Sequence, residues 1–500
     1  MNDADRLQAS EGAPTEAPTT PAVPAAGTAA TTGTAETAAT VAPWSPHADP
    51  AALRARLEEI LPQSLADLED LVRIPSIAFP GYDREPVRRS AEAVAALLRD
   101  AGMAEVTIES VQDGAPAVIA RTPAREGMPT VMLYAHHDVQ PTGDEDAWTS
   151  APFEPTRRGE RLFGRGAADD KAGVMAHVTA LRLVGEQLAA RGIGVTVFVE
   201  GEEECGSPTF RPFIEAHRDR LEADLIIVAD SANWAVGTPA LTTSLRGVVS
   251  ATVEVRVLEH AVHSGLFGGP VLDALTQLSR LVATLHDENG EVAVAGLVQA
   301  DDPTVEMPEE DYRRDAGVPE SLELSGTGGI AARLWTRPAL SVIGIDAPEV
   351  QKASNTLIPA ARAKLSLRIP PGQDPAAAMD ALVAHLEAHA PATAQVSVER
   401  GEEGKPYQAA QGTAATALAR AALSEAWGTD AVDTGLGGSI PFIADLLEVF
   451  GQAEVLVTGV EDPQSRAHGI DESLHLGEFA RVCLAEALLL SGAGSLGAQA

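Results

Sequence analysis

The sequence predicts an α/β fold in which a mainly parallel sheet carries helices on both faces and is interrupted by an inserted α+β domain. Short apolar runs at 131–135, 194–199 and 224–229 alternate with stretches of helical periodicity. This alternation is typical of strand–helix–strand units, which build parallel sheets covered on both sides. After residue 241 the pattern changes to longer strands and an irregular acidic stretch at 290–340, which indicates the inserted domain.

The domain boundaries follow from these changes in pattern. We expect the sheet domain to occupy residues 46–241 and 401–492, with the inserted domain at 242–400 and a short C-terminal tail at 493–500. Residues 1–45 are rich in Ala, Thr and Pro and contain almost no large apolar side chains. Because such a segment cannot bury enough apolar surface to offset its conformational entropy, we expect a disordered N-terminal tail.

The individual elements can be placed in chain order. The first helix should begin near Asp49 and end before Pro75, because the residue preceding proline avoids the helical conformation. Further helices are predicted at 86–102, 171–191, 270–286, 375–389, 412–427 and 476–491. Besides the three apolar runs, strands are predicted at 106–109, 117–120, 242–257, 339–345, 361–369, 395–398 and 454–458.

Composition narrows the class of protein. The 500 residues include 36 basic and 72 acidic ones, a formal net charge of −36. This excess argues against nucleic acid or an anionic membrane as a partner, favours solubility and leaves cation binding open. Two cysteines, Cys205 and Cys483, are too few for a disulfide framework and fit a reducing compartment. We find neither a secretory signal nor an apolar run of transmembrane length, and therefore expect a cytoplasmic protein.

Acidic and imidazole side chains follow each of the three apolar runs. They are His136 and Asp138 after the first run, Glu203 and Glu204 after the second, and Asp230 after the third. The adjacent carboxylates Asp169 and Asp170 follow a glycine-rich turn and would repel each other unless a cation, a donor cluster or water relieves them. Each group taken alone could be a solvated acidic loop. Because parallel strands end at one edge of a sheet, however, we expect these groups to converge there.

Five segments in order carry a family resemblance. They are Ala-His-His-Asp-Val-Gln-Pro at 135–141, Gly-Arg-Gly-Ala-Ala-Asp-Asp-Lys at 164–171, Glu-Gly-Glu-Glu-Glu-Cys-Gly-Ser at 200–207, Asp230, and His468 in a late loop. Together they resemble the di-zinc peptidase family of carnosinase, bacterial dipeptidases, carboxypeptidase G and succinyl-diaminopimelate desuccinylase, over residues 50–490. The long insertion and the Gln140-Pro141 ending look most like the carnosinase-type dipeptidases.

This resemblance implies a ligand set for two metal ions per chain. Asp169 would bridge the metals, His136 and Asp230 would bind one of them, and Glu204 and His468 would bind the other. Two imidazoles and three carboxylates form a mixed nitrogen and oxygen set that suits Zn²⁺, with Mn²⁺ or Co²⁺ as alternatives.

The resemblance also implies catalytic roles for two further carboxylates. Asp138 would orient His136, and Glu203 would be the general base for a hydroxide shared by the metals. The bond between Asp169 and Asp170 would be cis, which is rare without proline.

Substrate contacts are implied as well. His263 would reach the active site of a dimer partner and stabilise the oxyanion, and Arg368 would hold the substrate carboxylate. The remaining implied substrate residues are Thr356, Gly438 and Ser439. As alternatives, His263 is a histidine of a surface turn and Arg368 an arginine of a strand face. Leu436 departs from the pattern, since relatives often have Glu there.

The sequence leaves three functions as alternatives. The first is metal-dependent hydrolysis of dipeptides or short peptides with a free C-terminal carboxylate. The second is hydrolysis of N-acyl or N-carbamoyl amino acids by the same site. The third, more remote, is a non-catalytic binding protein on this fold, although every ligand and Glu203 are retained. By analogy with the family, the inserted domain should act as a lid and form a homodimer.

Overall fold

The structure is a computed structural model that describes residues 48–438 and 441–496. The predicted N-terminal tail at 1–45 and the implied substrate residue Ser439 lie outside the described residues. Of the predicted tail at 493–500, Ala493–Ser495 form the 3-10 helix η4, which continues the last α-helix.

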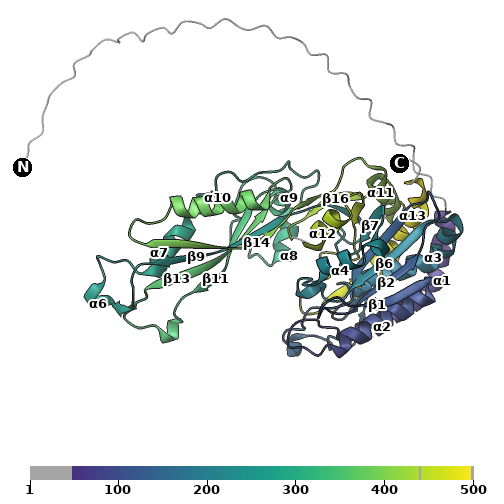
Figure 1. The fold of residues 1–500 in the computed structure, drawn as a ribbon, viewed down its shortest axis with the longest axis horizontal. Coiled ribbons are helices and arrows are strands. Elements are labelled where there is room, and N and C mark those ends of the chain that lie inside the picture. Colours follow the sequence, from purple (N-terminus) through teal and green to yellow (C-terminus); the bar gives the residue numbers. More distant parts are fainter. Residues whose placement is uncertain (1–47, 439–440, 497–500) are drawn as a thin grey trace, which may run out of the picture. The chain divides into compact units, whose positions relative to one another are not determined.

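A nine-stranded sheet carries half of the strands in the described part of the chain (Figure 1). Its centre consists of four parallel strands in the order β6 (Gly194–Glu200), β3 (Thr130–His136), β7 (Leu225–Val228) and β17 (Glu454–Val457). The flanking strands are β1 (Glu105–Glu109), β2 (Ala117–Thr122), β8 (Ala240–Leu245), β15 (Tyr407–Gln408) and β16 (Val432–Leu436). β1, β2 and β15 pair antiparallel, and β16 pairs parallel with β8. The predicted α/β sheet is therefore confirmed.

Helices cover both faces of this sheet because its strands are apolar on both sides. Val131 and Leu133 of β3 face one core, whereas Met132 and Tyr134 face the other, as alternation along a strand requires. The first core includes α1 (Pro50–Val72), α2 (Glu85–Asp100), α3 (Lys171–Arg191), α11 (Ala414–Trp427) and α13 (Leu476–Gly492). The second includes α4 (Phe210–Ala216), α5 (Arg218–Leu221) and α12 (Pro441–Val449). Helix α12 was not predicted from the sequence.

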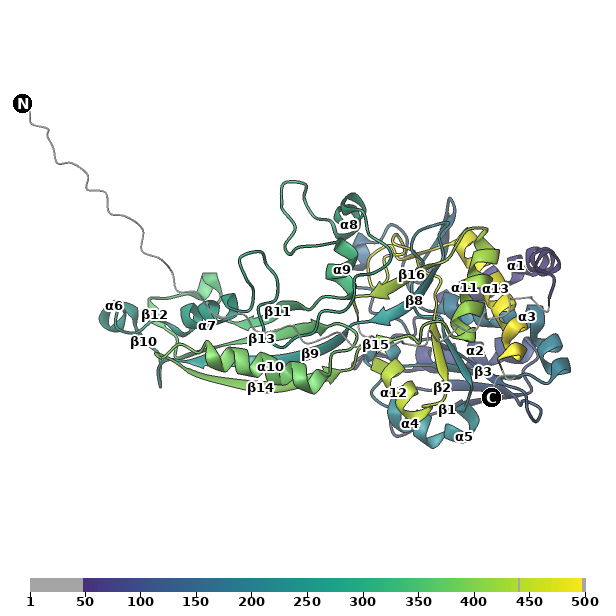
Figure 2. The same cartoon turned by 90° about the horizontal axis from the view of Figure 1, so that it is seen from above.

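A separate four-stranded antiparallel sheet is built from the inserted residues. Its order is β11 (Ala339–Asp346), β13 (Ala360–Ile369), β9 (Gly247–Arg256) and β14 (Gln395–Gly404). The helices α7 (Ala274–Ala283) and α10 (Pro375–Ala388) pack on one face of it and form its core (Figure 2). α7 is shorter than the helix predicted at 270–286.

The strand predicted at 242–257 is divided between the two sheets. β8 ends at Leu245 in the nine-stranded sheet, and β9 begins at Gly247 in the four-stranded one. A Cβ atom on Gly247 would lie 2.4 Å from the carbonyl oxygen of Gly404, so only glycine fits where the chain crosses. Periodicity missed the break because apolar residues continue on both sides of it.

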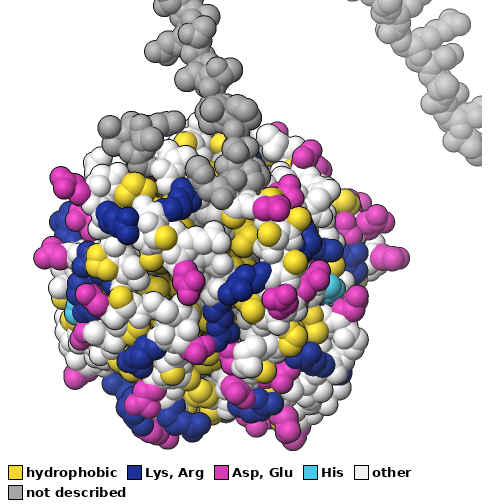
Figure 3. All heavy atoms as spheres, turned by 90° about the vertical axis from the view of Figure 1, so that its right-hand side faces the viewer, with side chains coloured by type: hydrophobic (Ala, Val, Ile, Leu, Met, Phe, Trp, Pro, Cys, Tyr) yellow, Lys and Arg dark blue, Asp and Glu magenta, His cyan; other side chains and the backbone are white. Residues whose placement is uncertain are grey.

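The remaining elements are short. A three-stranded sheet contains β18 (Ser473–His475), β5 (Arg161–Phe163) and β4 (Thr156–Arg158), and β10 (Val262–His263) pairs with β12 (Thr356–Leu357). The short helices are α6 (Ser264–Phe267), α8 (Glu309–Ala316), α9 (Ile330–Trp335), η1 (Glu145–Ala147), η2 (Glu203–Cys205) and η3 (Val350–Lys352). None of the helices within the described part of the chain has the length and apolar character to cross a bilayer. On the face shown in Figure 3, acidic and basic side chains are interspersed.

Candidate metal centre

The ends of neighbouring parallel strands deliver the candidate site residues to one edge of the sheet. His136 is the last residue of β3, Glu203 and Glu204 lie in η2 shortly after β6, and Asp230 follows β7. Asp169 lies just before α3, in the turn that leads from β5 into the helix. Since β6, β3 and β7 are adjacent and parallel, their C-terminal ends meet, as expected for a site in an open α/β sheet.

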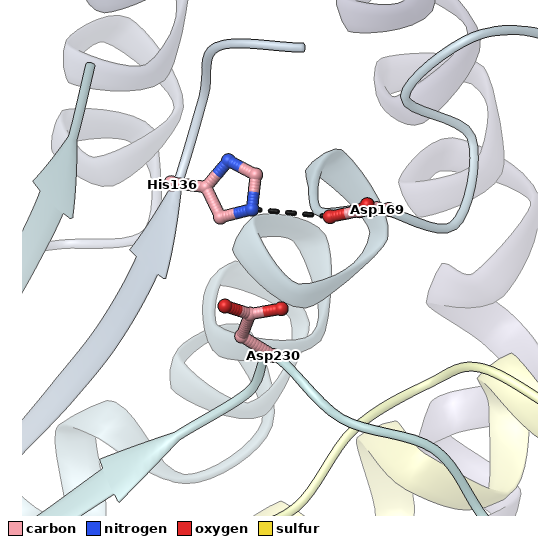
Figure 4. Close-up of side chains that lie close together, drawn as sticks. All are labelled: His136, Asp169 and Asp230. Atoms are coloured by element: carbon pink, nitrogen blue, oxygen red, sulfur yellow. Dashed lines mark hydrogen bonds and ion pairs between the residues drawn. The ribbon is translucent and has the colours of Figure 1, made fainter. Parts of the chain in front are cut away.

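The first group of potential ligands consists of His136, Asp169 and Asp230. One ligand atom from each of these residues lies within 4.8 Å of the other two. Nε2 of His136 is 3.1 Å from Oδ1 of Asp169, and the Asp230 carboxylate points toward both side chains (Figure 4). Three elements that are distant in sequence therefore present one nitrogen and two carboxylates to a common point.

The second group consists of Asp169, Glu204 and His468. Nε2 of His468 lies 3.1 Å from Oδ2 of Asp169 and 3.3 Å from Oε2 of Glu204. The two groups share Asp169, which uses a different oxygen toward each histidine. The structure therefore brings together all five residues expected to bind metal, in the expected division around Asp169.

Asp138 connects both groups through the backbone. Its Oδ1 and Oδ2 accept hydrogen bonds from the backbone N–H groups of Glu203 and Glu204, each at 3.1 Å. Nδ1 of His136 lies 3.2 Å from the carbonyl oxygen of Asp138 and 3.5 Å from its Oδ1. Asp138 thus contacts the His136 ring and also fixes the turn that carries the two glutamates.

The peptide bond between Asp169 and Asp170 is cis, in agreement with the resemblance. The buried side chain of Asp170 accepts a hydrogen bond at 3.1 Å from the backbone N–H of His136. Asp170 therefore faces the end of β3, while Asp169 faces the ligand cluster.

The cluster concentrates negative charge in a buried place. Burial raises the pKa of Glu203 well above its usual value, and the nearby charge of Asp230 adds to this effect. Burial likewise raises the pKa of Asp230 to about 7, assisted by the charge of Asp169. Burial alone would raise the pKa of Asp169, but hydrogen bonds with His136 and His468 lower it. Carboxylates packed in this way need positive charge, and the five nitrogen and oxygen donors fit two divalent cations.

Comparison with known proteins agrees with this geometry. The pattern of peptidase family M20/M25/M40 matches residues 132–491. The chain belongs to this peptidase family. It is 35% identical over 410 residues to a cysteinylglycine-S-conjugate dipeptidase of Corynebacterium striatum, covering 80% of this chain and 89% of the relative. It is 26% identical over 457 residues to the Cys-Gly metallodipeptidase DUG1 of Candida albicans, covering 85% and 94%.

A solved structure shows the same fold. Human carnosine dipeptidase 1 superimposes with a TM-score of 0.72 at 24% sequence identity, covering 90% of this chain and all of that one. The resemblance inferred from the five sequence segments is therefore confirmed, and the M20 chain described here is an enzyme of the metallopeptidase class.

The implied substrate residues of this M20 peptidase fall into two groups. Burial lowers the pKa of the Arg246 guanidinium to about 10, and the positive charge of Arg368 on β13 adds to this effect. Nε of Arg246 in turn donates a hydrogen bond to the carbonyl oxygen of Gly437, at 3.2 Å, beside Gly438. His263 and Thr356 are instead partners in the β10–β12 ladder, and the His263 ring accepts a hydrogen bond from the backbone of Gly265.

Four residues that support the site were not predicted from the sequence. Arg246 is buried, and its Nη1 also donates to the carbonyl oxygens of Arg333 and Arg337 near the end of α9. The backbone and side-chain amides of Gln140 donate to the Glu204 carboxylate, at 3.1 and 2.6 Å. The other two are Arg165 and Glu472, which form a buried ion pair of 2.7 Å. Gln140 and Arg165 lie within the segments that carry the family resemblance, so the sequence indicated their positions but not their contacts.

Proposed function

We propose that this M20 peptidase hydrolyses dipeptides that have a free C-terminal carboxylate, using two Zn²⁺ ions per chain. The observation that carries the proposal is the sharing of Asp169 by two groups of ligand atoms, with Glu203 beside them but in neither group. Two relatives that match most of the chain are named as dipeptidases, which supports dipeptides as the substrate class of this chain.

The proposed ligands are His136 and Asp230 for one metal, Glu204 and His468 for the other, and Asp169 for both. Manganese or cobalt would suit the same nitrogen and oxygen donors. When bound, the metals would polarise the scissile carbonyl and lower the pKa of the attacking water.

Glu203 is proposed to move the proton. Its carboxylate would accept the proton of the attacking water and deliver it to the leaving nitrogen. A general base must lie close to the metals, but it must not coordinate them, because a coordinated carboxylate oxygen is a poor proton acceptor. Asp138 would hold Glu203 in place through the hydrogen bond from the Glu203 backbone N–H.

Arg368 and the Gly438 turn are proposed to recognise the substrate carboxylate. A guanidinium can bind a carboxylate with two parallel hydrogen bonds, and Arg246 adds a second positive charge nearby. Dipeptides and N-acyl amino acids share this carboxylate and differ at the other end. Leu436, at the end of β16, places an apolar side chain where the family resemblance leads us to expect a carboxylate. This observation favours N-acyl or N-carbamoyl amino acids as a second candidate.

A substrate panel separates these possibilities. The panel contains a dipeptide, its C-terminal amide and the corresponding N-acyl amino acid. We expect the dipeptide to have a kcat/KM at least about 100-fold above that of the amide, since the amide lacks the negative charge and the second acceptor oxygen that a guanidinium recognises. We also expect the kcat/KM of the dipeptide to exceed that of the N-acyl compound. A preference for the N-acyl compound would establish the second candidate, and equal rates on dipeptide and amide would contradict carboxylate recognition.

We also propose a homodimer formed through the four-stranded sheet. β11 is an edge strand that pairs with β13 on one side, and six of its eight residues are exposed. Val342, Ile343 and Ile345 on this strand are 43%, 58% and 52% exposed. An unpaired apolar edge is suited to pairing with a second copy of itself about a twofold axis. His263 and Thr356 would then be available to the partner's site.

Lysines on this edge should produce a monomer. We expect light scattering to give twice 51.9 kDa for the wild type and 51.9 kDa for the double variant Ile343→Lys, Ile345→Lys. Leu322→Lys, at another exposed apolar residue, is the matched control and should remain dimeric. A double variant that stays dimeric would place the interface elsewhere.

Mixed dimers test whether His263 acts in the partner's site. His263→Ala and Glu203→Gln should each be nearly inactive, but their mixed dimer contains one site with both residues intact. Co-expression of the two variants should therefore recover about a quarter of wild-type activity, given random pairing. No recovery would assign His263 to its own subunit's site, and full activity of His263→Ala alone would assign it to the protein surface.

A further inference from the structure

A buried carboxylate outside the ligand set holds the turn that carries Asp169. Oε1 of Glu472 accepts hydrogen bonds from the backbone N–H groups of Ala168 and Asp169, at 2.9 and 3.1 Å. Its Oε2 accepts one from the backbone N–H of Gly166, at 3.0 Å. The Glu472 side chain is fully buried, so it acts on Asp169 through the backbone and has no access to substrate.

Arg165 neutralises this carboxylate and extends the contact to two other segments. Its Nη1 donates to Oε2 of Glu472 at 2.7 Å. Its Nη2 donates to the carbonyl oxygens of Pro141 and Gly469, at 3.3 and 3.1 Å. The Arg165 side chain is 2% exposed, so these bonds form where water does not compete.

The three connected segments contain two of the three ligands of the second group, Asp169 and His468, and contact the third, Glu204. Gly469 follows His468 directly, and Pro141 follows Gln140, whose amides hold the Glu204 carboxylate. The turn at 166–169 supplies Asp169. By contrast, His136 and Asp230 are placed by the ends of β3 and β7 in the central sheet.

We propose that Arg165 and Glu472 are positioning residues for the second metal, bound by Asp169, Glu204 and His468, and that their loss weakens that metal selectively. The inference rests on the proposed two-metal function. It goes beyond that function by assigning a purpose to a buried ion pair which touches neither metal ligand side chains nor substrate. Residues that orient ligands commonly affect metal affinity by about 10- to 100-fold.

Zinc binding to metal-stripped protein tests this assignment. Calorimetric titration with Zn²⁺ alone should show two sites in the wild type. In Glu472→Gln, which keeps the shape but loses the charge, we expect one site weakened at least about 10-fold and the other, which shares only Asp169 with it, weakened clearly less. Arg165→Lys keeps the charge but cannot reach both carbonyls, and should give an intermediate loss. Turnover at limiting zinc should fall, and added zinc should restore part of it at unchanged KM.

A second, partly buried ion pair provides the control. Asp67 on α1 and Arg182 on α3 pair at 2.7 Å, with side chains 13% and 14% exposed. Asp67→Asn should lower the melting temperature without changing either zinc affinity. Two wild-type zinc affinities in Glu472→Gln, or equal weakening of both sites, would overturn the inference. If Glu472→Gln does not fold, Arg165→Lys decides by the same criterion. A wild type that binds fewer than two Zn²⁺ overturns the proposed function instead.

Discussion

Replacing Glu203 with glutamine should leave two metals bound and lower kcat by about 10²- to 10⁴-fold. The carboxylate of Glu203 belongs to neither group of ligand atoms, so its loss removes no metal ligand. Glutamine has nearly the same shape and keeps the backbone hydrogen bond to Asp138, but it cannot accept a proton at neutral pH. The measurement is steady-state hydrolysis of a dipeptide, together with the metal content of the same sample.

Glu202 offers a matched control one residue away. Its buried carboxylate accepts hydrogen bonds from the backbone of Ala115 and Thr209, and so it fixes the loop instead of facing the ligands. Glu202→Gln should lower the melting temperature and leave two metals and most of kcat in place. Normal turnover by Glu203→Gln with both metals bound would contradict the proposed mechanism.

The convergence of His136, Glu204 and Asp230 could be predicted because it depends on a general property of parallel sheets, whereas His468 was expected only from the family resemblance. His136, Glu204 and Asp230 each follow an apolar strand, and adjacent parallel strands must end at the same edge. Asp169 could be predicted because it follows a glycine-rich turn just before a strongly periodic helix. These signals are local in sequence, whereas the meeting of the side chains follows from topology.

The supporting residues could not be predicted because their role depends on contacts between distant parts of the chain. Arg165 and Glu472 are 307 positions apart, and neither stretch shows that one side chain neutralises the other. Arg246 looked like a residue inside one long strand, although the chain changes sheets beside it. Helix α12 directly follows a glycine-rich turn and has only nine residues, which is too few for helical periodicity to indicate it.

The separation of the implied substrate residues into two groups also depends on contacts between distant parts of the chain. Their sequence order does not reveal that Arg368 lies near Arg246 while His263 pairs with Thr356 in another ladder. Both placements follow from which strands pair in the inserted region, and pairing between strands about 100 residues apart cannot be inferred from the order of residues along the chain.

Removal of metal should abolish hydrolysis and its restoration should recover it. Buried carboxylates without a counter-charge cannot activate water, so we expect chelator-stripped protein to lose at least about 100-fold in kcat. The protein should stay folded, because the four central strands and their two helix layers surround cores that do not involve the ligands. Circular dichroism before and after stripping checks this expectation.

The most direct test is therefore a titration of the stripped protein with Zn²⁺ while dipeptide hydrolysis is followed. The proposed site predicts that activity rises to a plateau at two Zn²⁺ per chain, because Asp169 is shared by two ligand groups. Full activity at one Zn²⁺ per chain, or undiminished activity in the stripped protein, would contradict a two-metal site.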